Sequence, residues 1–151
     1  MRPATLLFLA ALTLCSCDSE NYGSITHRGR DGRPDQWITR SNDKEYQISI
    51  DTNGDGKPDL IKTIKGDQLV EIRSDRNFNG QVDLVQEYLN GVMVREVRDD
   101  DYNGRPETVK TFRPNGTLAI IERDPDERGA ISIIEYYDKD GHLTHREVRG
   151  K

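Results

Sequence analysis

The sequence is poor in hydrophobic residues and nearly devoid of cysteine and tryptophan. Only 33% of its 151 residues are hydrophobic, whereas 32% are charged, and it contains two cysteines and one tryptophan. A chain of this length forms one domain, and a domain this polar cannot assemble a thick two-sided core. The composition therefore argues against a deep enclosed active site and against a bundle of transmembrane helices.

Both cysteines lie in the amino-terminal segment MRPATLLFLAALTLCSC. Arg2 precedes an apolar run from Leu6 to Leu14, which is too short for a stable transmembrane helix and is typical of a signal-peptide core. The end of the run resembles a bacterial lipobox, in which Cys17 is the residue that carries lipid. We expect a lipoprotein signal peptide over residues 1–16; an ordinary secretory signal is the alternative.

Processing before Cys17 would remove Cys15 and leave no partner, so a disulfide framework is excluded. Diacylation of Cys17, for example with palmitate, together with an amide-linked chain would supply enough hydrophobic anchors for stable membrane attachment. The polar residues 17–26 then form the lipidated cysteine and a flexible tether. The expected location is the bacterial cell envelope, in a membrane leaflet that the sequence leaves open.

Residues 27–151 form the repeat domain. Segments that begin at His27, Asp51, Asp75 and Asp99 align with a period of 24 residues, and an eroded fifth copy begins at Asp124. A second series of turns has glycines 25 residues apart. These turns are Lys65-Gly66, Asn90-Gly91, Asn115-Gly116 and Asp140-Gly141. Asn-Gly and Asp-Gly pairs readily adopt positive φ at both central positions of a tight turn, so each is expected to close a hairpin.

The segments between the turns are short and rich in Ile, Val, Thr and Tyr, as in LIKTI and VMVREV. This length and composition predict strands rather than helices. Apolar and charged residues occur on both faces of the strands, which predicts a thin, twisted or curled sheet. We therefore expect an all-β antiparallel meander of about ten strands, connected alternately by tight turns and acidic loops.

The acidic loops carry oxygen-bearing side chains at positions one, three, five and nine, with glycine at position six. Calcium takes about six to eight oxygen ligands, which a compact loop can supply from side chains and a backbone carbonyl. The candidate ligands are Asp51, Asn53, Asp55, the Lys57 carbonyl and Asp59 in one loop, Asp75, Asn77, Asn79 and Asp83 in the next, and Asp99, Asp101, Asn103 and Glu107 in the third. The loops at His27 and Asp124 have lost ligands and are expected to be simple turns.

The segment DTNGDGKPDL from Asp51 resembles the calcium loop of FG-GAP and VCBS repeats and is similar to the loops of dockerins and thrombospondin type 3 repeats. The resemblance implies calcium binding by the ligands named for this loop, with a weaker likeness in the two loops that follow. An EF-hand would place a bidentate Glu at position twelve. This chain instead has Lys62, Gln86 and Lys110 there.

The segment YYDKDGHLTHREV from Tyr136 resembles the short β-hairpin repeats of the MORN-like and YwqK-type families, which are rarely enzymes. The acidic loops also have a purely structural explanation, because Asp, Asn, Gly and Pro favour turns without any metal. His142 and His145 would face opposite sides of a strand, so a metal shared between them is not expected. Trp37, Tyr136 and Tyr137 are interpreted as core residues rather than as a glycan platform.

The sequence has no GxSxG, HExxH, P-loop or Cys-His combination, so no enzymatic activity is expected. The net charge of −5 also argues against a nucleic-acid partner. The sequence predicts a membrane-anchored envelope lipoprotein with calcium-stabilised β-repeats and a structural or interaction role. A metal-free module that binds an envelope protein or polysaccharide is the main alternative, and an accessory or inhibitor of a hydrolase is a third.

Overall fold

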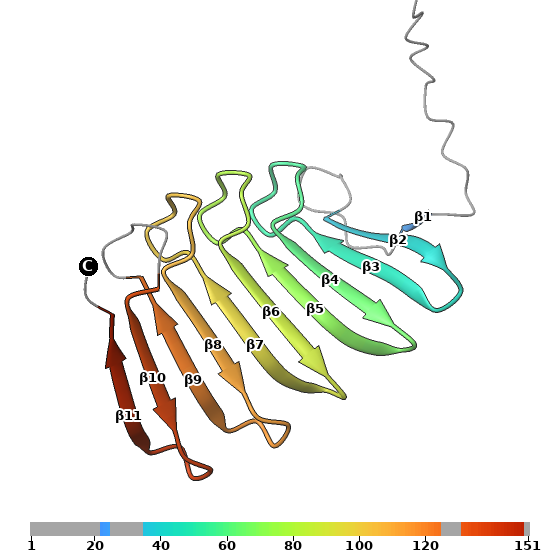
Figure 1. The fold of residues 1–151 in the computed structure, drawn as a ribbon. Coiled ribbons are helices and arrows are strands. Elements are labelled where there is room, and N and C mark those ends of the chain that lie inside the picture. Colours follow the sequence, from blue (N-terminus) through green and yellow to red (C-terminus); the bar gives the residue numbers. More distant parts are fainter. Residues whose placement is uncertain (1–21, 25–34, 125–130, 150–151) are drawn as a thin grey trace, which may run out of the picture.

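The computed structural model of the chain describes residues 22–24, 35–124 and 131–149 (Figure 1). The predicted signal peptide, the lipid site at Cys17 and the loop segment 27–34 lie outside the described residues, as do residues 125–130 of the loop that begins at Asp124.

The described residues form one antiparallel sheet of eleven strands, each paired with its neighbours in chain order. The strands are β1 (Tyr22–Ser24), β2 (Gln36–Asn42), β3 (Glu45–Ile50), β4 (Leu60–Lys65), β5 (Gln68–Ser74), β6 (Leu84–Leu89), β7 (Val92–Arg98), β8 (Thr108–Phe112), β9 (Leu118–Arg123), β10 (Ile133–Tyr137) and β11 (Leu143–Val148). The predicted all-β meander is confirmed. The strand β1 lies inside the segment that the sequence assigns to the tether.

The sheet is a single twisted layer (Figure 1), and its hydrophobic side chains are mostly half-buried. No described side chain is less than 2% exposed, and the buried hydrophobic residues of the described chain are Ile38, Ile121 and Ile134. Successive side chains of a strand point to opposite faces, so each face carries an incomplete apolar row. Stability must therefore come largely from pairing between neighbouring hairpins, as in other repeat folds.

The tight turns lie at one end of the sheet and the acidic loops at the other (Figure 1). Asn90 and Gly91 both have positive φ, 52° and 79°, as a two-residue type I′ turn requires. In the turn after β4, the two consecutive residues with positive φ are Gly66 and Asp67, at 54° and 62°. They lie one residue later than the predicted pair Lys65-Gly66. In the other two predicted turns only the glycine has positive φ: Gly116 (83°) and Gly141 (86°). All four glycine-containing turns close hairpins, but both residues of the predicted pair have positive φ only at Asn90-Gly91.

Backbone hydrogen bonds stack the acidic loops on one another. The N–H of Asp75 donates to the carbonyl of Asp59 at 2.7 Å, and the N–H of Asp99 donates to that of Asp83 at 2.9 Å. The amide at position one of each loop thus bonds to the carbonyl at position nine of the loop before it. The same bond joins Asp51 to Asp35 and Asp124 to Glu107.

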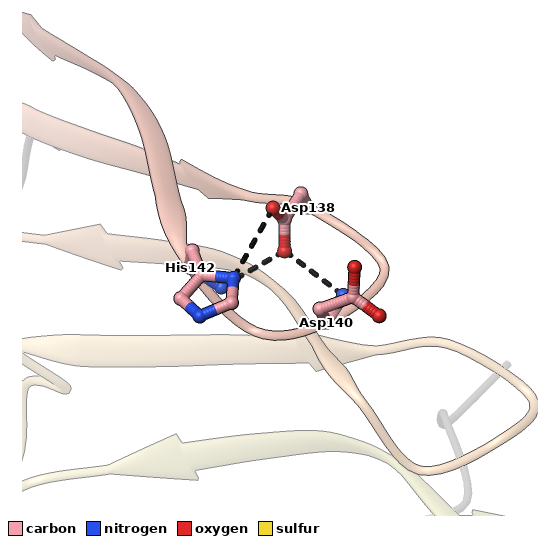
Figure 2. Close-up of side chains that lie close together, drawn as sticks. All are labelled: Asp138, Asp140 and His142. Carbon is pink, nitrogen blue, oxygen red and sulfur yellow. Dashed lines mark hydrogen bonds and ion pairs between the residues drawn. The ribbon is translucent and has the colours of Figure 1, made fainter.

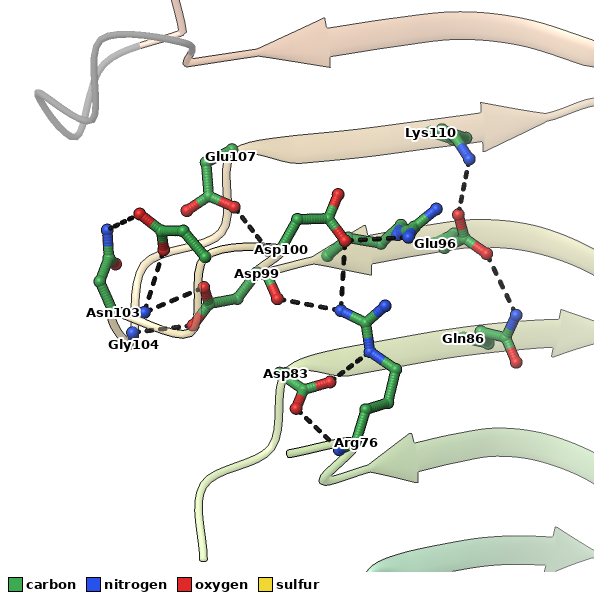
Figure 3. A network of polar contacts seen from close by, with 12 residues as sticks. Arg76, Asp83, Gln86, Glu96, Asp99, Asp100, Asn103, Gly104, Glu107 and Lys110 are labelled. Atoms are coloured by element: carbon green, nitrogen blue, oxygen red, sulfur yellow. Dashed lines mark hydrogen bonds and ion pairs between the residues drawn. The ribbon is translucent and has the colours of Figure 1, made fainter. Parts of the chain in front are cut away.

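One face of the sheet carries a buried polar ladder across β6, β7 and β8. Glu96 is 9% exposed and accepts hydrogen bonds from Lys110 Nζ at 2.8 Å and from Gln86 Nε2 at 3.1 Å (Figure 3). The three residues are direct cross-strand partners. Polar cross-strand contacts therefore occupy positions that an apolar core would fill in a two-layer domain.

Candidate metal-binding loops

The most buried side chains of the acidic loops are carboxylates at their bases. At position one, Asp51, Asp75 and Asp99 are 7%, 7% and 5% exposed, and at position nine Asp59 and Asp83 are 6% and 5% exposed. The side chains at positions three and five are exposed, apart from the half-buried Asn77. Burial of a carboxylate is costly unless hydrogen bonds or cations compensate the charge, so the partners of these groups determine what the loops can bind.

Each position-one carboxylate accepts hydrogen bonds from the backbone of its own loop. Asp51 accepts N–H bonds from Gly54 and Gly56 at 2.6 and 2.7 Å. The donors in the other loops are Asn79 and Gly80 for Asp75, and Asn103 and Gly104 for Asp99. The position-six glycine that closes each loop has a φ of 85° to 90°. L side chains rarely adopt this conformation, so glycine lets the chain turn its amides back towards the first carboxylate.

These amide contacts shift the protonation equilibrium of Asp51. Partial desolvation raises the pKa of its carboxyl group, but N–H donation from Gly56, Gly54 and neighbouring amides outweighs this effect. The net pKa of Asp51 lies below its ordinary value. The loop therefore favours the charged carboxylate, which is the form that binds a cation.

The carboxylates at position nine have different partners in the three loops. Asp59 accepts bonds from the backbone N–H and the hydroxyl of Thr52, at 2.8 and 2.7 Å. Asp83 accepts bonds from the backbone N–H and the Nε of Arg76, at 2.7 and 2.5 Å. Glu107 accepts one bond, from the N–H of Asp100 at 2.7 Å.

The side chains at positions three and five form Asx turns. Each accepts an N–H bond from the residue two positions later, at 2.8 to 3.0 Å. The acceptors are Asn53, Asp55, Asn77, Asn79, Asp101 and Asn103. The loops thus adopt the turn geometry that these residues form without metal, while a carboxylate that accepts one bond keeps further lone pairs for a cation.

In the third loop the side chains converge as a metal site requires. Oxygen atoms of Asp99, Asp101 and Glu107 all lie within 4.8 Å of one another. The second carboxylate oxygen of Glu107, Oε1, is buried and has no hydrogen-bond partner within the described chain. Figure 3 shows Asp99 and Glu107 at the loop that connects β7 and β8. This cluster could hold a metal ion.

The loop at Asp51 best matches the calcium-loop pattern, but within the described chain its three carboxylates do not form such a group. The second loop has only two carboxylates among its candidate ligands, because Asn77 and Asn79 occupy positions three and five. In the first loop Asp59 is engaged by Thr52. In the second loop the guanidinium of Arg76 brings a positive charge to Asp83 (Figure 3). The third loop has Asp100 at the corresponding position and the longer Glu107 at position nine. Lys57, whose carbonyl the sequence includes among the ligands, is exposed in the first loop.

A second cluster, which the sequence analysis did not identify, lies in the turn between β10 and β11 (Figure 2). Ligand atoms of Asp138, Asp140 and His142 lie within 4.8 Å of one another and could hold a metal ion. N–H donation from His142 lowers the pKa of the Asp138 carboxyl. The alternation of Asp, Asp and His at residues 138, 140 and 142 is the signal that could have revealed the cluster. His145 instead lies beside Tyr136, with ring centroids 5.7 Å apart.

Comparison of the chain with protein-family models, with curated proteins and with solved structures gave no match. Within the described ranges, no helix has the length and apolar character needed to cross a membrane.

Proposed function

We propose that this chain is a lipid-anchored envelope protein in which calcium stabilises a single-layer β-repeat domain, and that the domain has a structural or interaction role. The observation that carries the calcium proposal is the convergence of Asp99, Asp101 and Glu107, together with the buried, unpartnered Oε1 of Glu107. An oxygen-only donor set suits a hard cation such as calcium rather than a soft transition metal. Because the sheet has so little apolar core, a bound ion would add most order at its acidic loops.

Calcium titration of the soluble repeat domain tests this proposal. Extracellular calcium modules have dissociation constants of about 10⁻⁴ to 10⁻³ M. At about 2 mM calcium, binding to the folded state alone then adds about 0.6–1.8 kcal/mol of stability. We expect the melting temperature in calcium to exceed that in chelator by several degrees, and we expect Glu107→Gln to abolish most of this difference.

The control is Glu45→Gln, because Glu45 lies outside the loops and pairs with Lys65 at 3.1 Å. This variant should keep the full response to calcium. Identical melting curves of the parent domain in calcium and in chelator would contradict calcium stabilisation. An equal calcium response in Glu107→Gln would exclude the third loop as its source.

The anchor at Cys17 is a separate part of the proposal, supported by the lipobox-like sequence LCSC. Mass spectrometry of the full-length protein from a bacterial membrane fraction should show acyl chains on Cys17. Cys17→Ser should lose this mass and leave the membrane fraction. Acylation that persists in the Cys17→Ser protein would contradict the assignment.

A metal-free interaction module is the second candidate. It is favoured by the Asx turns that organise all three loops and by the guanidinium that Arg76 brings to Asp83. In this case the acidic loops are turns whose charges are already compensated by protein groups. The calcium titration distinguishes the two candidates.

A further inference from the structure

Two of the hollows on one face of the sheet, beside the acidic loops, are translated copies of each other. The first is lined in part by Pro58, Ile61, Arg73 and Val82. The second is lined in part by Val82, Val85, Val97 and Pro106. Each residue of the second set lies 24 positions after its counterpart in the first set. The sequence repeat is therefore also a repeat of surface shape.

The two hollows join into one groove that crosses the strands. Ile61, Arg73, Val85 and Val97 are successive partners on β4, β5, β6 and β7, and they form its floor. The volumes of the two hollows are about 140 and 280 Å³. Since both hollows are lined by Arg73 and Val82, they are adjacent rather than separate. We call this feature the aliphatic groove.

The chemistry of the aliphatic groove favours an apolar ligand. Its acidic lining residues include Asp59, Asp83 and Asp99, which are at most 6% exposed and whose carboxylates already accept hydrogen bonds. The accessible groups are the aliphatic side chains, the exposed amide of Gln81 and the guanidinium of Arg73. The Arg73 side chain is 53% exposed and pairs with Glu71 through Nε at 2.8 Å. A sugar chain would leave many hydroxyl groups facing aliphatic surface without partners, at a cost in free energy.

The spacing of the hollows indicates the conformation of the ligand. Equivalent positions of the repeat are two strands apart, which corresponds to about 9.4–9.8 Å across a sheet. A polyproline II helix has three residues per turn and rises about 9.3 Å per turn. Every third residue of such a peptide would therefore meet successive hollows. We propose that the aliphatic groove binds a proline-rich peptide in the polyproline II conformation.

The charges beside the groove add two features to this ligand. The backbone of a polyproline II helix makes no internal hydrogen bonds, so its carbonyls can accept bonds from the guanidinium of Arg73, which carries five N–H donors. The exposed carboxylate of Asp55 in the neighbouring loop favours a basic residue that flanks the proline-rich segment. The proposal rests on the interaction role proposed above and does not require calcium.

Fluorescence anisotropy with a synthetic peptide tests the proposal. The probe is a fluorescein-labelled peptide of three Leu-Pro-Pro triplets flanked by arginines, titrated with the repeat domain in calcium and in chelator. We expect saturable binding to the parent protein and an affinity at least about tenfold lower for Val82→Asp and for Arg73→Glu. Both positions are exposed, at 45% for Val82 and 53% for the Arg73 side chain, so both variants should fold.

Two matched controls are available. One lies at the tight-turn end of the sheet, and the other lies on the same face as the aliphatic groove. Leu89→Asp changes an aliphatic residue that is 59% exposed and lies beside a tight turn, and Arg95→Ala removes an arginine paired with Glu87 on the groove's face of the sheet. Both should bind like the parent protein. A Leu-Gly-Gly peptide with the same flanks should bind much more weakly because it lacks the preformed conformation.

Three outcomes would overturn the proposal. These are an absence of peptide binding, with or without binding of a β-linked oligosaccharide such as chitohexaose, equal peptide binding by Val82→Asp, and equal peptide binding by Arg73→Glu. Peptide binding that is unchanged in chelator would support the groove even if the melting curves exclude calcium. Calcium stabilisation without peptide binding would leave the calcium proposal intact and reject this one.

Discussion

At the scale of the residue, buried carboxylates that accept hydrogen bonds stabilise much of this fold. Glu96 shows how they are stabilised. Desolvation raises the pKa of its carboxyl group, but hydrogen bonds from Lys110 and Gln86, together with the positive charges of Lys110 and Arg98, outweigh it and leave a net pKa below the ordinary value. The folded state therefore stabilises the ionised form of Glu96 more than the unfolded state does.

The pH dependence of stability follows from this shift. A carboxyl group with a lowered pKa in the folded state stabilises the protein fully above its unfolded pKa of about 4.3, and this contribution is lost as the pH falls through the folded-state pKa. Glu96→Gln should cost about 1–3 kcal/mol at neutral pH. It should also make the stability less sensitive to acid below about pH 5. Urea unfolding at several pH values measures both effects.

Glu87→Gln is the matched control for this experiment, because the Glu87 side chain is 41% exposed and pairs with Arg95 at 2.8 Å. Exposed pairs contribute about 0–1 kcal/mol, so this control should follow the parent protein closely. If Glu96→Gln had the same stability and the same acid sensitivity as the parent, the stabilising role of the buried ladder would be wrong.

At the scale of the element, one side chain joins two acidic loops. Arg76 binds Asp83 within its own loop, and its Nη2 donates to the carbonyl of Asp99 at 2.9 Å and to Asp100 Oδ1 at 3.3 Å in the next loop. Its guanidinium also lies 5.6 Å from the ring centroid of Tyr102. Since the Asp83 side chain is only 3% exposed, Arg76 compensates a carboxylate that water reaches poorly.

We expect Arg76→Ala to lower the free energy of unfolding by about 1–3 kcal/mol, because it leaves Asp83 with fewer partners. Amide hydrogen exchange should accelerate in both loops, 75–83 and 99–107, because the contact between them is lost. Arg95→Ala, which breaks an exposed ion pair, should cost less than about 1 kcal/mol. Faster exchange in the loop 75–83 alone would show that Arg76 does not join the two.

At the scale of the whole molecule, the sequence predicts the strands and their order but not the partners of the polar side chains. The hairpins could be predicted because short strand-forming segments alternate with glycine-containing turns, as at Asn90-Gly91. The strand β1 could not, because Tyr22, Gly23 and Ser24 have no apolar alternation; this strand pairs with β2 at the edge of the described sheet.

The candidate site could be predicted only in part. Spacing identifies the oxygens that a loop offers, and the three loops do bury their first carboxylates. Which loop gathers its carboxylates depends on side-chain reach and on the partner at position nine, since Glu107 approaches Asp99 and Asp101 whereas Asp59 binds Thr52. The competing partners, Thr52 and Arg76, lie at position two of the same loop, so the spacing of the oxygen-bearing positions alone does not reveal them.

The hydrogen bond from the first amide of each acidic loop to the ninth carbonyl of the loop before it recurs at every described step of the stack. Duplication or loss of one 24-residue unit would present the same donor to the same acceptor and keep every later strand in register. Unequal recombination can therefore add or remove units, two strands at a time, while the contact between neighbouring units stays the same. The length of the sheet is therefore a trait that evolution can adjust in whole steps.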